Sequence, residues 1–224
     1  MESQSSTTNR QWLRAIFAAG IQAFVYAILL AAMTQAIVHQ AARPELTDQY
    51  GEQSLTEWLQ VIFLSIGAAL LMWKAAVSAE RRPLEILLAG MLIIACIREF
   101  DWAFETYVGQ HGWPAAAALA ALVTATLVYR RRHLLASQIE EFLKHPSYGI
   151  MLCGFLVVFV FSRIFGEEHF WRNVLGSNYL RVAKNCAEEN TELLGYFLLL
   201  VSVIEWVRSR PAPTNAERGT RSAE

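Results

Sequence analysis

Long apolar stretches alternate with short polar segments along the chain. Six of these stretches are close to the roughly 20 residues that a helix needs to cross a hydrocarbon core about 30 Å thick. The pattern predicts an all-α protein with a polytopic six-helix transmembrane bundle over residues 10–208, flanked by disordered tails at 1–9 and 209–224. The six predicted spans are Trp12–Val38, Thr56–Val77, Leu84–Tyr107, Trp113–Val128, Ser147–Phe165 and Glu188–Val207.

The positions of Lys and Arg indicate the orientation, because cytoplasmic loops carry the excess of these residues. With the N-terminus inside, 13 of the 19 Lys and Arg residues lie on the inner side of the six spans and 6 on the outer side. This favours a multi-pass protein of the plasma (inner) membrane with both termini in the cytoplasm. A signal peptide is the alternative for the first span, but its apolar stretch is much longer than the usual roughly 7–15 residues.

Composition agrees with a membrane protein. Hydrophobic residues make up 54% of the chain and charged residues 17%, below the roughly 25% of soluble domains. The formal net charge of −1 gives no indication of nucleic-acid binding, and three scattered cysteines do not form a disulfide framework. The expected partner is the lipid bilayer, with a homo-oligomer or a membrane partner as further alternatives.

Two segments between the spans are amphipathic. Residues His133–His145 are predicted to form a short cytoplasmic interfacial helix. Its apolar face would carry Leu135, Ile139, Phe142 and Leu143, opposite Gln138, Glu141 and Lys144. On the outer side, Gly166–Ala187 mixes aromatic and charged residues and is predicted to contain an outer amphipathic segment.

Polar side chains recur at the outer ends of four spans. At 1.5 Å per residue, Arg98 lies about 21 Å from the inner edge of its span, Arg163 about 24 Å and Glu192 about 22 Å. Because lipid cannot solvate such groups, we expect them to turn inward and meet, with Arg98–Glu192 as a buried pair. The candidate ligand-binding set of this polar layer is Glu57, Gln60, Arg98, Glu99, Asp101, Glu105, Arg163, Glu167, Glu188 and Glu192.

The polar layer contains more carboxylates than arginines. We therefore expect at least one carboxylate to hold a proton or a cation, with Asp101 and Glu192 as the leading candidates. The preferred function is an outward-opening acidic, Arg- and His-containing layer that binds a cation, a proton or a polar headgroup.

Two alternatives follow from the same residues. One is a membrane-embedded hydrolase of lipid-linked substrates, with Asp101, Glu192 and His169 as candidate catalytic residues. Its cofactor would be a divalent metal such as Zn or Mn, with His39, His111 and His169 as candidate ligands, although the chain has no tight ligand spacing such as HExxH. In the other, the layer is structural and only holds the helices together.

Overall fold

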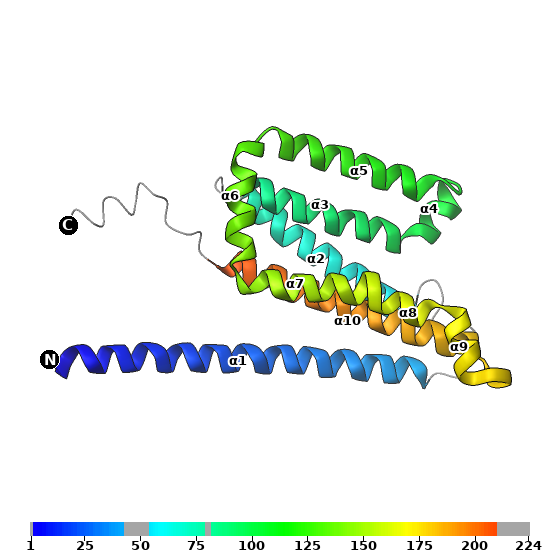
Figure 1. Ribbon diagram of the computed structural model, residues 1–224, viewed down its shortest axis with the longest axis horizontal. Helices are drawn as coiled ribbons and strands as arrows, with labels where there is room; N and C mark the ends of the chain where they lie inside the picture. The colour runs from blue at the N-terminus through cyan, green and yellow to red at the C-terminus, as the bar shows by residue number, and fades with distance from the viewer. Residues whose placement is uncertain (1, 43–53, 79–81, 210–224) are drawn as a thin grey trace. The chain divides into compact units, whose positions relative to one another are not determined.

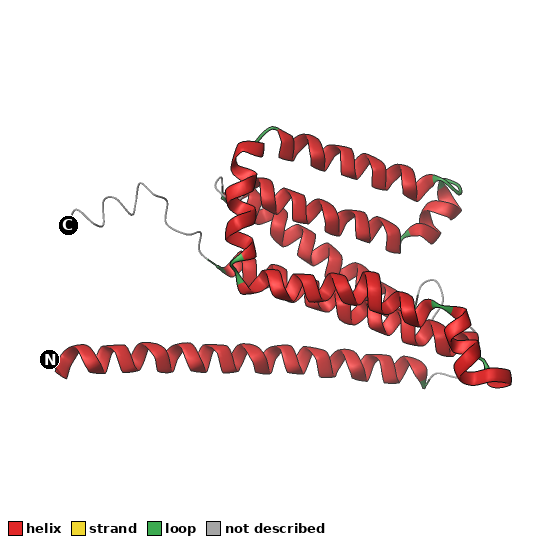
Figure 2. Cartoon of the chain, in the orientation of Figure 1, coloured by secondary structure: helices red, strands yellow, loops and turns green. Residues whose placement is uncertain are grey.

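The structure is a computed structural model that describes residues 2–42, 54–78 and 82–209. Within these residues every regular element is helical, which confirms the all-α prediction (Figure 2). Five described helices are long and apolar enough to cross a membrane. They cover 12–41, 55–77, 112–129, 146–166 and 181–208. Their length and composition are compatible with a membrane protein.

The chain divides into two units, residues 1–49 and 50–224. The first unit contains α1 (Glu2–Ala41), a single helix of 40 residues with large apolar side chains such as Phe17 and Phe24 exposed. Residues 2–9, which we predicted as a disordered tail, belong to this helix. Residues 210–224 of the predicted C-terminal tail lie outside the described residues.

The second unit is built on two neighbouring helices, α2 (Leu55–Val77) and α10 (Arg181–Arg208). Helix α3 (Arg82–Glu99) packs on α2, α5 (Gly112–Tyr129) packs on α3, and α7 (Pro146–Leu156) packs on α10 (Figure 1). The core between them consists of aliphatic and aromatic side chains, among them Leu64, Leu71, Leu92, Val203 and Trp206.

Two glycines let α7 and α10 approach closely. A Cβ on Gly195 would overlap the side chain of Val158 and lie 3.0 Å from the carbonyl oxygen of Gly154. A Cβ on Gly154 would lie 2.8 Å from a methyl carbon of Leu199. Small residues at a contact between apolar helices allow this approach in membranes as well as in water. The contact fixes the position of the residues that follow α7 against α10.

Those residues continue as a π-helical turn, η1 (Val157–Phe161), and the short helix α8 (Ser162–Gly166). The backbone N–H of Ser162 bonds to the carbonyl of Val157, five residues back. Helix α8 also packs on α10. The predicted span Ser147–Phe165 is therefore helical throughout, with a π turn inside it.

The predicted span Leu84–Tyr107 is broken, which corrects the sequence analysis. Helix α3 ends at Glu99, and α4 (Asp101–Tyr107) begins after Phe100, whose φ of −97° and ψ of 18° leave the helical range. The Phe100 N–H bonds to the carbonyls of both Cys96 and Ile97 at 3.2 Å, an arrangement common at helix ends. Arg98 therefore lies in a different helix from Asp101 and Glu105, which the predicted span had placed in one helix.

The reason for the break lies partly in Asp101. Its Oδ1 accepts the Trp102 backbone N–H at 2.6 Å. Asp side chains compete in this way with continued helix and favour helix starts. With Arg82 and Glu85 at one end and Arg98 and Glu99 at the other, α3 is not among the five apolar helices.

The segment predicted to be an interfacial helix is helical, as α6 (Arg132–Leu143), at the opposite end of the unit from α4 (Figure 1). Its Phe142 packs against Trp206 with ring centroids 5.0 Å apart. Gln138, predicted on the polar face, is buried, and its Oε1 accepts the Leu84 N–H at 3.0 Å. Ile139 and Leu143, predicted on the same face as Phe142, are exposed. Leu135 and Phe142 of the predicted apolar face pack on the core, but they do so with Gln138 instead of Ile139 and Leu143, so the contacting face is rotated from the predicted one.

The predicted outer amphipathic segment contains α9 (Glu168–Leu175) and the single turn η2 (Gly176–Asn178). The indole N–H of Trp171 donates to the Phe165 carbonyl at 2.6 Å, so α9 folds back toward the end of α8. Helix α10 begins directly afterwards, at Arg181.

Candidate functional site

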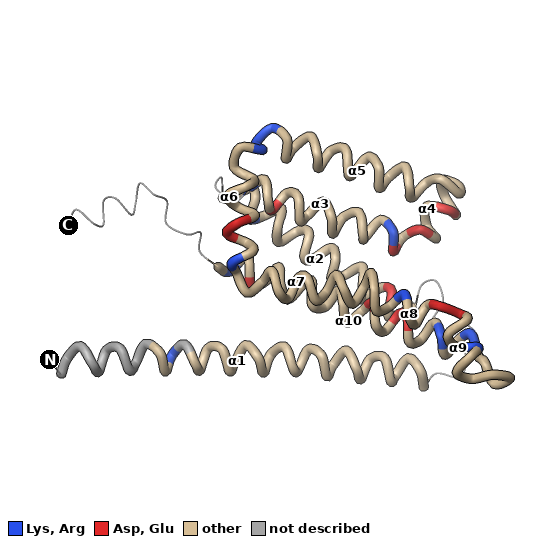
Figure 3. The backbone as a smooth tube through the Cα atoms, viewed as in Figure 1, with Lys and Arg blue, Asp and Glu red and all other residues tan. Residues whose placement is uncertain are grey.

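Charged residues lie close together in the chain where α3 ends, and along α8 and the part of α10 that α8 contacts (Figure 3). The sequence predicted that the charged groups of these three segments meet. Arg98 of α3, Arg163 of α8 and Glu192 of α10 do meet, and the predicted Arg98–Glu192 pair is confirmed at 3.2 Å between Nη2 and Oε2.

Glu192 is the centre of this arrangement and is only 2% exposed. Its Oε2 pairs with Arg98, and its Oε1 pairs with Arg163 and accepts the Ser162 hydroxyl at 3.2 Å. Both carboxylate oxygens therefore have partners from other helices. A buried carboxylate needs such partners, because an uncompensated charge in a low dielectric is costly.

A second carboxylate, Glu99, lies on the other side of Arg98. Arg98 reaches it with Nε at 3.1 Å and with Nη2 at 3.0 Å, and the Tyr196 hydroxyl donates to it at 2.6 Å. Tyr196 lies one helical turn beyond Glu192 in α10. Of the two carboxylates that flank Arg98, α10 therefore carries one, Glu192, and donates a hydrogen bond to the other, Glu99 of α3. The Nη1 group of Arg98 has no acceptor among the described residues, and the side chain is 35% exposed.

A third carboxylate, Glu188, joins Arg163 to Lys184. Arg163 Nη1 lies 3.3 Å from its Oε1, and Lys184 Nζ lies 2.9 Å from its Oε2. A side chain on Gly166 would overlap the Glu188 carboxylate, so this glycine gives the carboxylate its space. Six side chains thus form one ion-pair network, consisting of Arg98, Arg163, Lys184, Glu99, Glu188 and Glu192.

Next to the ion-pair network, Gln60 and Glu189 form a contact that includes no ion pair among the described residues. The amide nitrogen of Gln60 in α2 donates to the backbone carbonyl of Glu189 at 3.1 Å and to its Oε2 at 3.0 Å. Gln60 is fully buried, and its Oε1 has no hydrogen-bond partner in the described part of the chain. The three cations and three carboxylates of the network balance, so Glu189 is the excess carboxylate of the site.

Several predicted site residues lie outside these contacts. Asp101 and Glu105 are exposed on α4, and Glu167 is exposed and accepts the His169 N–H at 3.4 Å. Glu57 is half-buried in the first turn of α2, where its backbone N–H donates to Ser54 Oγ. The structure therefore joins Gln60, Arg98, Glu99, Arg163, Glu188 and Glu192 but does not join Asp101, Glu105 or Glu167 to them in the described contacts.

The candidate metal ligands are also separate. His111 and His169 are exposed, at the start of α5 and in α9, and His39 belongs to the first unit. Over residues 2–42, 54–78 and 82–209, no group of three His, Cys, Asp or Glu side chains could hold a metal ion. In the same ranges no hydrogen bond or ion pair joins Asp101, Glu192 and His169 to one another.

Four residues of the site were not among the candidates: Ser162, Lys184, Glu189 and Tyr196. Lys184 and Tyr196 lie four residues before Glu188 and four after Glu192, so the spacing of neighbours on one helix face could have identified both. Glu189 lies three residues before Glu192, so the same spacing could have identified it. Ser162 had no such signal, because it is adjacent to Arg163 and its contact with Glu192 depends on how α8 packs against α10.

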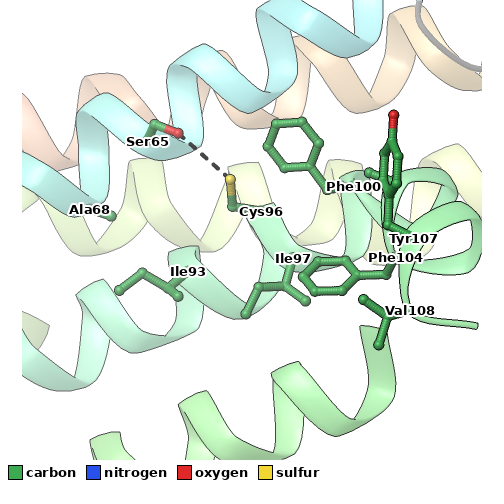
Figure 4. A pocket seen from close by; sticks show the side chains of 10 residues that line it. Ser65, Ala68, Ile93, Cys96, Ile97, Phe100, Phe104, Tyr107 and Val108 are labelled. Atoms are coloured by element: carbon green, nitrogen blue, oxygen red, sulfur yellow. Dashed lines mark hydrogen bonds between the residues drawn. The ribbon is translucent and has the colours of Figure 1, made fainter. Parts of the chain in front are cut away.

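An apolar pocket of about 600 Å³ lies between α2, α3 and α4 (Figure 4). Its polar contact is the 3.6 Å approach of the Cys96 thiol to the Ser65 hydroxyl, and no charged side chain lines it. It offers room for hydrocarbon but no acid or base. It therefore does not support hydrolytic chemistry.

No known protein family, curated protein or solved structure matches the chain.

Proposed function

We propose that the chain is a plasma-membrane protein whose outer polar layer holds a proton or a small cation at Glu189 and Gln60. Both termini are placed in the cytoplasm on the 13-to-6 distribution of Lys and Arg. In this topology α3 counts as the sixth span. Its 18 residues extend about 27 Å, close to the roughly 30 Å of the hydrocarbon core.

The observation that carries the proposal is the fourth carboxylate. Glu189 contacts Gln60 but has no ion pair among the described residues, and the buried Oε1 of Gln60 lacks a donor. A lone carboxylate at membrane depth and an unsatisfied buried oxygen are each costly. A proton on the carboxylate, or a cation bound to these oxygens, removes the uncompensated charge. Carboxylate and carbonyl oxygens suit hard cations such as Ca²⁺ and Mg²⁺.

The ion-pair network has a supporting role in this proposal. It connects α3, α8 and α10 through Glu192 and so fixes the rotation of α10 about its axis. That rotation decides whether Glu189 faces Gln60. The hydrolase alternative gains no support, because its three candidate catalytic residues are not in contact.

The test is thermal unfolding of the purified protein in detergent between pH 5 and pH 8, with and without CaCl₂ or MgCl₂. A ligand of the native state at tenfold its Kd contributes about 1.4 kcal/mol, or about 3–6 °C in Tm for a chain of this length. Wild type should show such a shift with acid or with one of the salts. Glu189→Gln should abolish it, because the amide keeps the hydrogen bond to Gln60 but cannot take up the charge.

The matched control is Glu168→Gln, which neutralises an exposed carboxylate in α9 and should leave the wild-type shift intact. Equal profiles for wild type and Glu189→Gln would overturn the proposal and leave the structural role of the polar layer.

A further inference from the structure

A second apolar pocket lies between α3, α5, α7 with η1, and α10. Its volume is about 520 Å³, within the roughly 300–1,000 Å³ of ligand pockets. Its walls are apolar or aromatic, with Phe155 and Phe159 on one side and Trp113 on another. The exceptions are Arg98 and Tyr196, which also contact the ion-pair network.

Arg98 lies at one end of the pocket. It is seven residues beyond Met91, another lining residue of α3, which is about 10 Å along the helix. Trp113, in the first turn of α5, lines the pocket too, and Trp at a span end is typical of the headgroup level of a membrane. The pocket therefore runs from hydrocarbon depth to a guanidinium at headgroup depth.

One nitrogen of the Arg98 guanidinium forms no hydrogen bond with the described residues. Its Nε and Nη2 are used by Glu99 and Glu192, whereas Nη1 has no acceptor among the described residues. Arg is the side chain best suited to phosphate oxygens. An apolar pocket lined at one end by an arginine with an unused donor matches an amphiphile with a phosphate at the head of a hydrocarbon chain.

The net charge of the site around Arg98 indicates which kind of headgroup the amphiphile carries. With Glu189 ionised, the site carries one more carboxylate than cations, which disfavours a ligand with net negative charge. A zwitterionic headgroup gives its phosphate to Arg98 and its ammonium to the carboxylates. We propose that the pocket holds one acyl chain of a zwitterionic glycerophospholipid, with the phosphate on Arg98. The apolar walls and the contact of the phosphate with Arg98 do not involve Glu189. The preference for a zwitterionic headgroup does, because it is expected only while Glu189 is ionised and holds no cation, so lipid titration tests the pocket and thermal unfolding tests Glu189.

The experiment is native mass spectrometry of the delipidated full chain titrated with phosphatidylethanolamine, phosphatidylglycerol, diacylglycerol or inorganic phosphate. One phosphatidylethanolamine should bind, at least tenfold more tightly than either other lipid. Inorganic phosphate should neither bind nor displace it. Stronger binding of phosphatidylglycerol or diacylglycerol, displacement by phosphate, or no lipid bound at one equivalent would each overturn the proposal.

Variants locate the lipid. Ala95→Phe should fill the pocket and weaken binding at least tenfold, whereas Ala118→Phe, on an exposed position of α5, should leave it unchanged. Arg98→Lys keeps the charge with fewer donors and should remove the preference over diacylglycerol. As a measure independent of these variants, a chain with Trp113 as its single tryptophan should lose fluorescence on binding one phosphatidylethanolamine with brominated chains. Equal affinity for both phenylalanine variants, a retained preference in Arg98→Lys, or unquenched Trp113 would contradict the assignment.

Discussion

Glu192 is the side chain on which three helices depend. It is nearly inaccessible, and its two oxygens join Arg98 of α3 to Arg163 and Ser162 of α8. Removing one partner of a buried pair is costly because the other charge stays behind. The two arginines keep Glu99 and Glu188 as second partners and are partly exposed, which limits that cost.

Glu192→Ala should therefore destabilise the protein by about 3 kcal/mol, the low end of the range for breaking a buried pair. Glu192→Gln should cost less, because an amide oxygen still accepts from Ser162. Reversible unfolding in mixed micelles measures both. Glu168→Ala removes an exposed i,i+4 pair with Arg172 and should change stability by less than about 1 kcal/mol. Equal losses for Glu192→Ala and Glu168→Ala would contradict the central role of Glu192.

Glu140, on the surface of α6, gives a prediction about pH. The hydrogen bond from Lys144, at 2.5 Å, and the charge of that ammonium lower the pKa of Glu140 from its usual value. A lowered pKa in the folded state contributes stability above the unfolded pKa and loses it as the pH falls through the folded pKa. Thermal unfolding of wild type and Lys144→Gln should differ slightly at neutral pH and converge in acid. A difference that grows on acidification would show that the pair is not formed.

The contact of α7 with α10 sets the geometry that the ion pairs require. The backbones approach at Gly154 and Gly195, where neither glycine has room for a side chain. Arg163 follows this contact by nine residues and Glu192 precedes Gly195 by three. Ion pairing at one place and close packing at the other therefore support each other along the same pair of helices.

Gly195→Ala should destabilise the protein by about 1–3 kcal/mol through overpacking, and it should also weaken the Arg163–Glu192 pair. Gly149→Ala is the control within α7, because beyond the adjoining helix backbone no atom lies within 4 Å of the added Cβ. It should be neutral or stabilising by up to about 1 kcal/mol, the helix-propensity gain of Ala over Gly. The measurement is the free energy of unfolding of both variants in the same detergent. An unchanged free energy in Gly195→Ala would show that α7 and α10 can move apart without loss of stability.

Whether the two termini lie on the same side of a membrane depends on whether the number of spans is even or odd. With α3 as a span, both termini lie on the same side. Without it, the five apolar helices would place them on opposite sides. A C-terminal fusion to a reporter that is active only in the cytoplasm should be active, and a fusion after Gly176 should be inactive. Activity from the Gly176 fusion alone would show that the assigned orientation is wrong.

Depth along the spans was predictable from the sequence, but rotation about them was not. Counting residues placed Arg98, Arg163 and Glu192 at similar heights, and these three do meet. The count cannot distinguish Glu188 from Glu189, because adjacent residues differ by about 100° of rotation, and packing decides which one faces α2.

The break at Phe100 was missed for a related reason. Hydrophobicity continues through Trp102 and Phe104, whereas the bifurcated hydrogen bond of Phe100 and the turn-forming side chain of Asp101 end the helix. The contacting face of α6 was predicted incorrectly because Gln138 is a polar residue that is nevertheless buried. Its side-chain oxygen accepts the Leu84 N–H at the buried start of α3.

The ion-pair network depends on the number of residues in α7 and the π turn η1, because they directly precede α8 and its Arg163. The wider ring of η1 places one residue more in the segment than a regular helix would need, and so sets the phase of α8. Conservative exchanges in η1, such as Val160→Leu, keep that phase. Deleting Val160 would remove the extra residue, so the segment would close as regular helix with Arg163 close to its present direction. Inserting a residue into a regular turn of α7 would instead rotate everything after it by about 100° and carry Arg163 away from Glu188 and Glu192. Between Gly154 and Arg163, then, the chain should tolerate exchanges among apolar side chains and the loss of one residue from η1, but not an added residue.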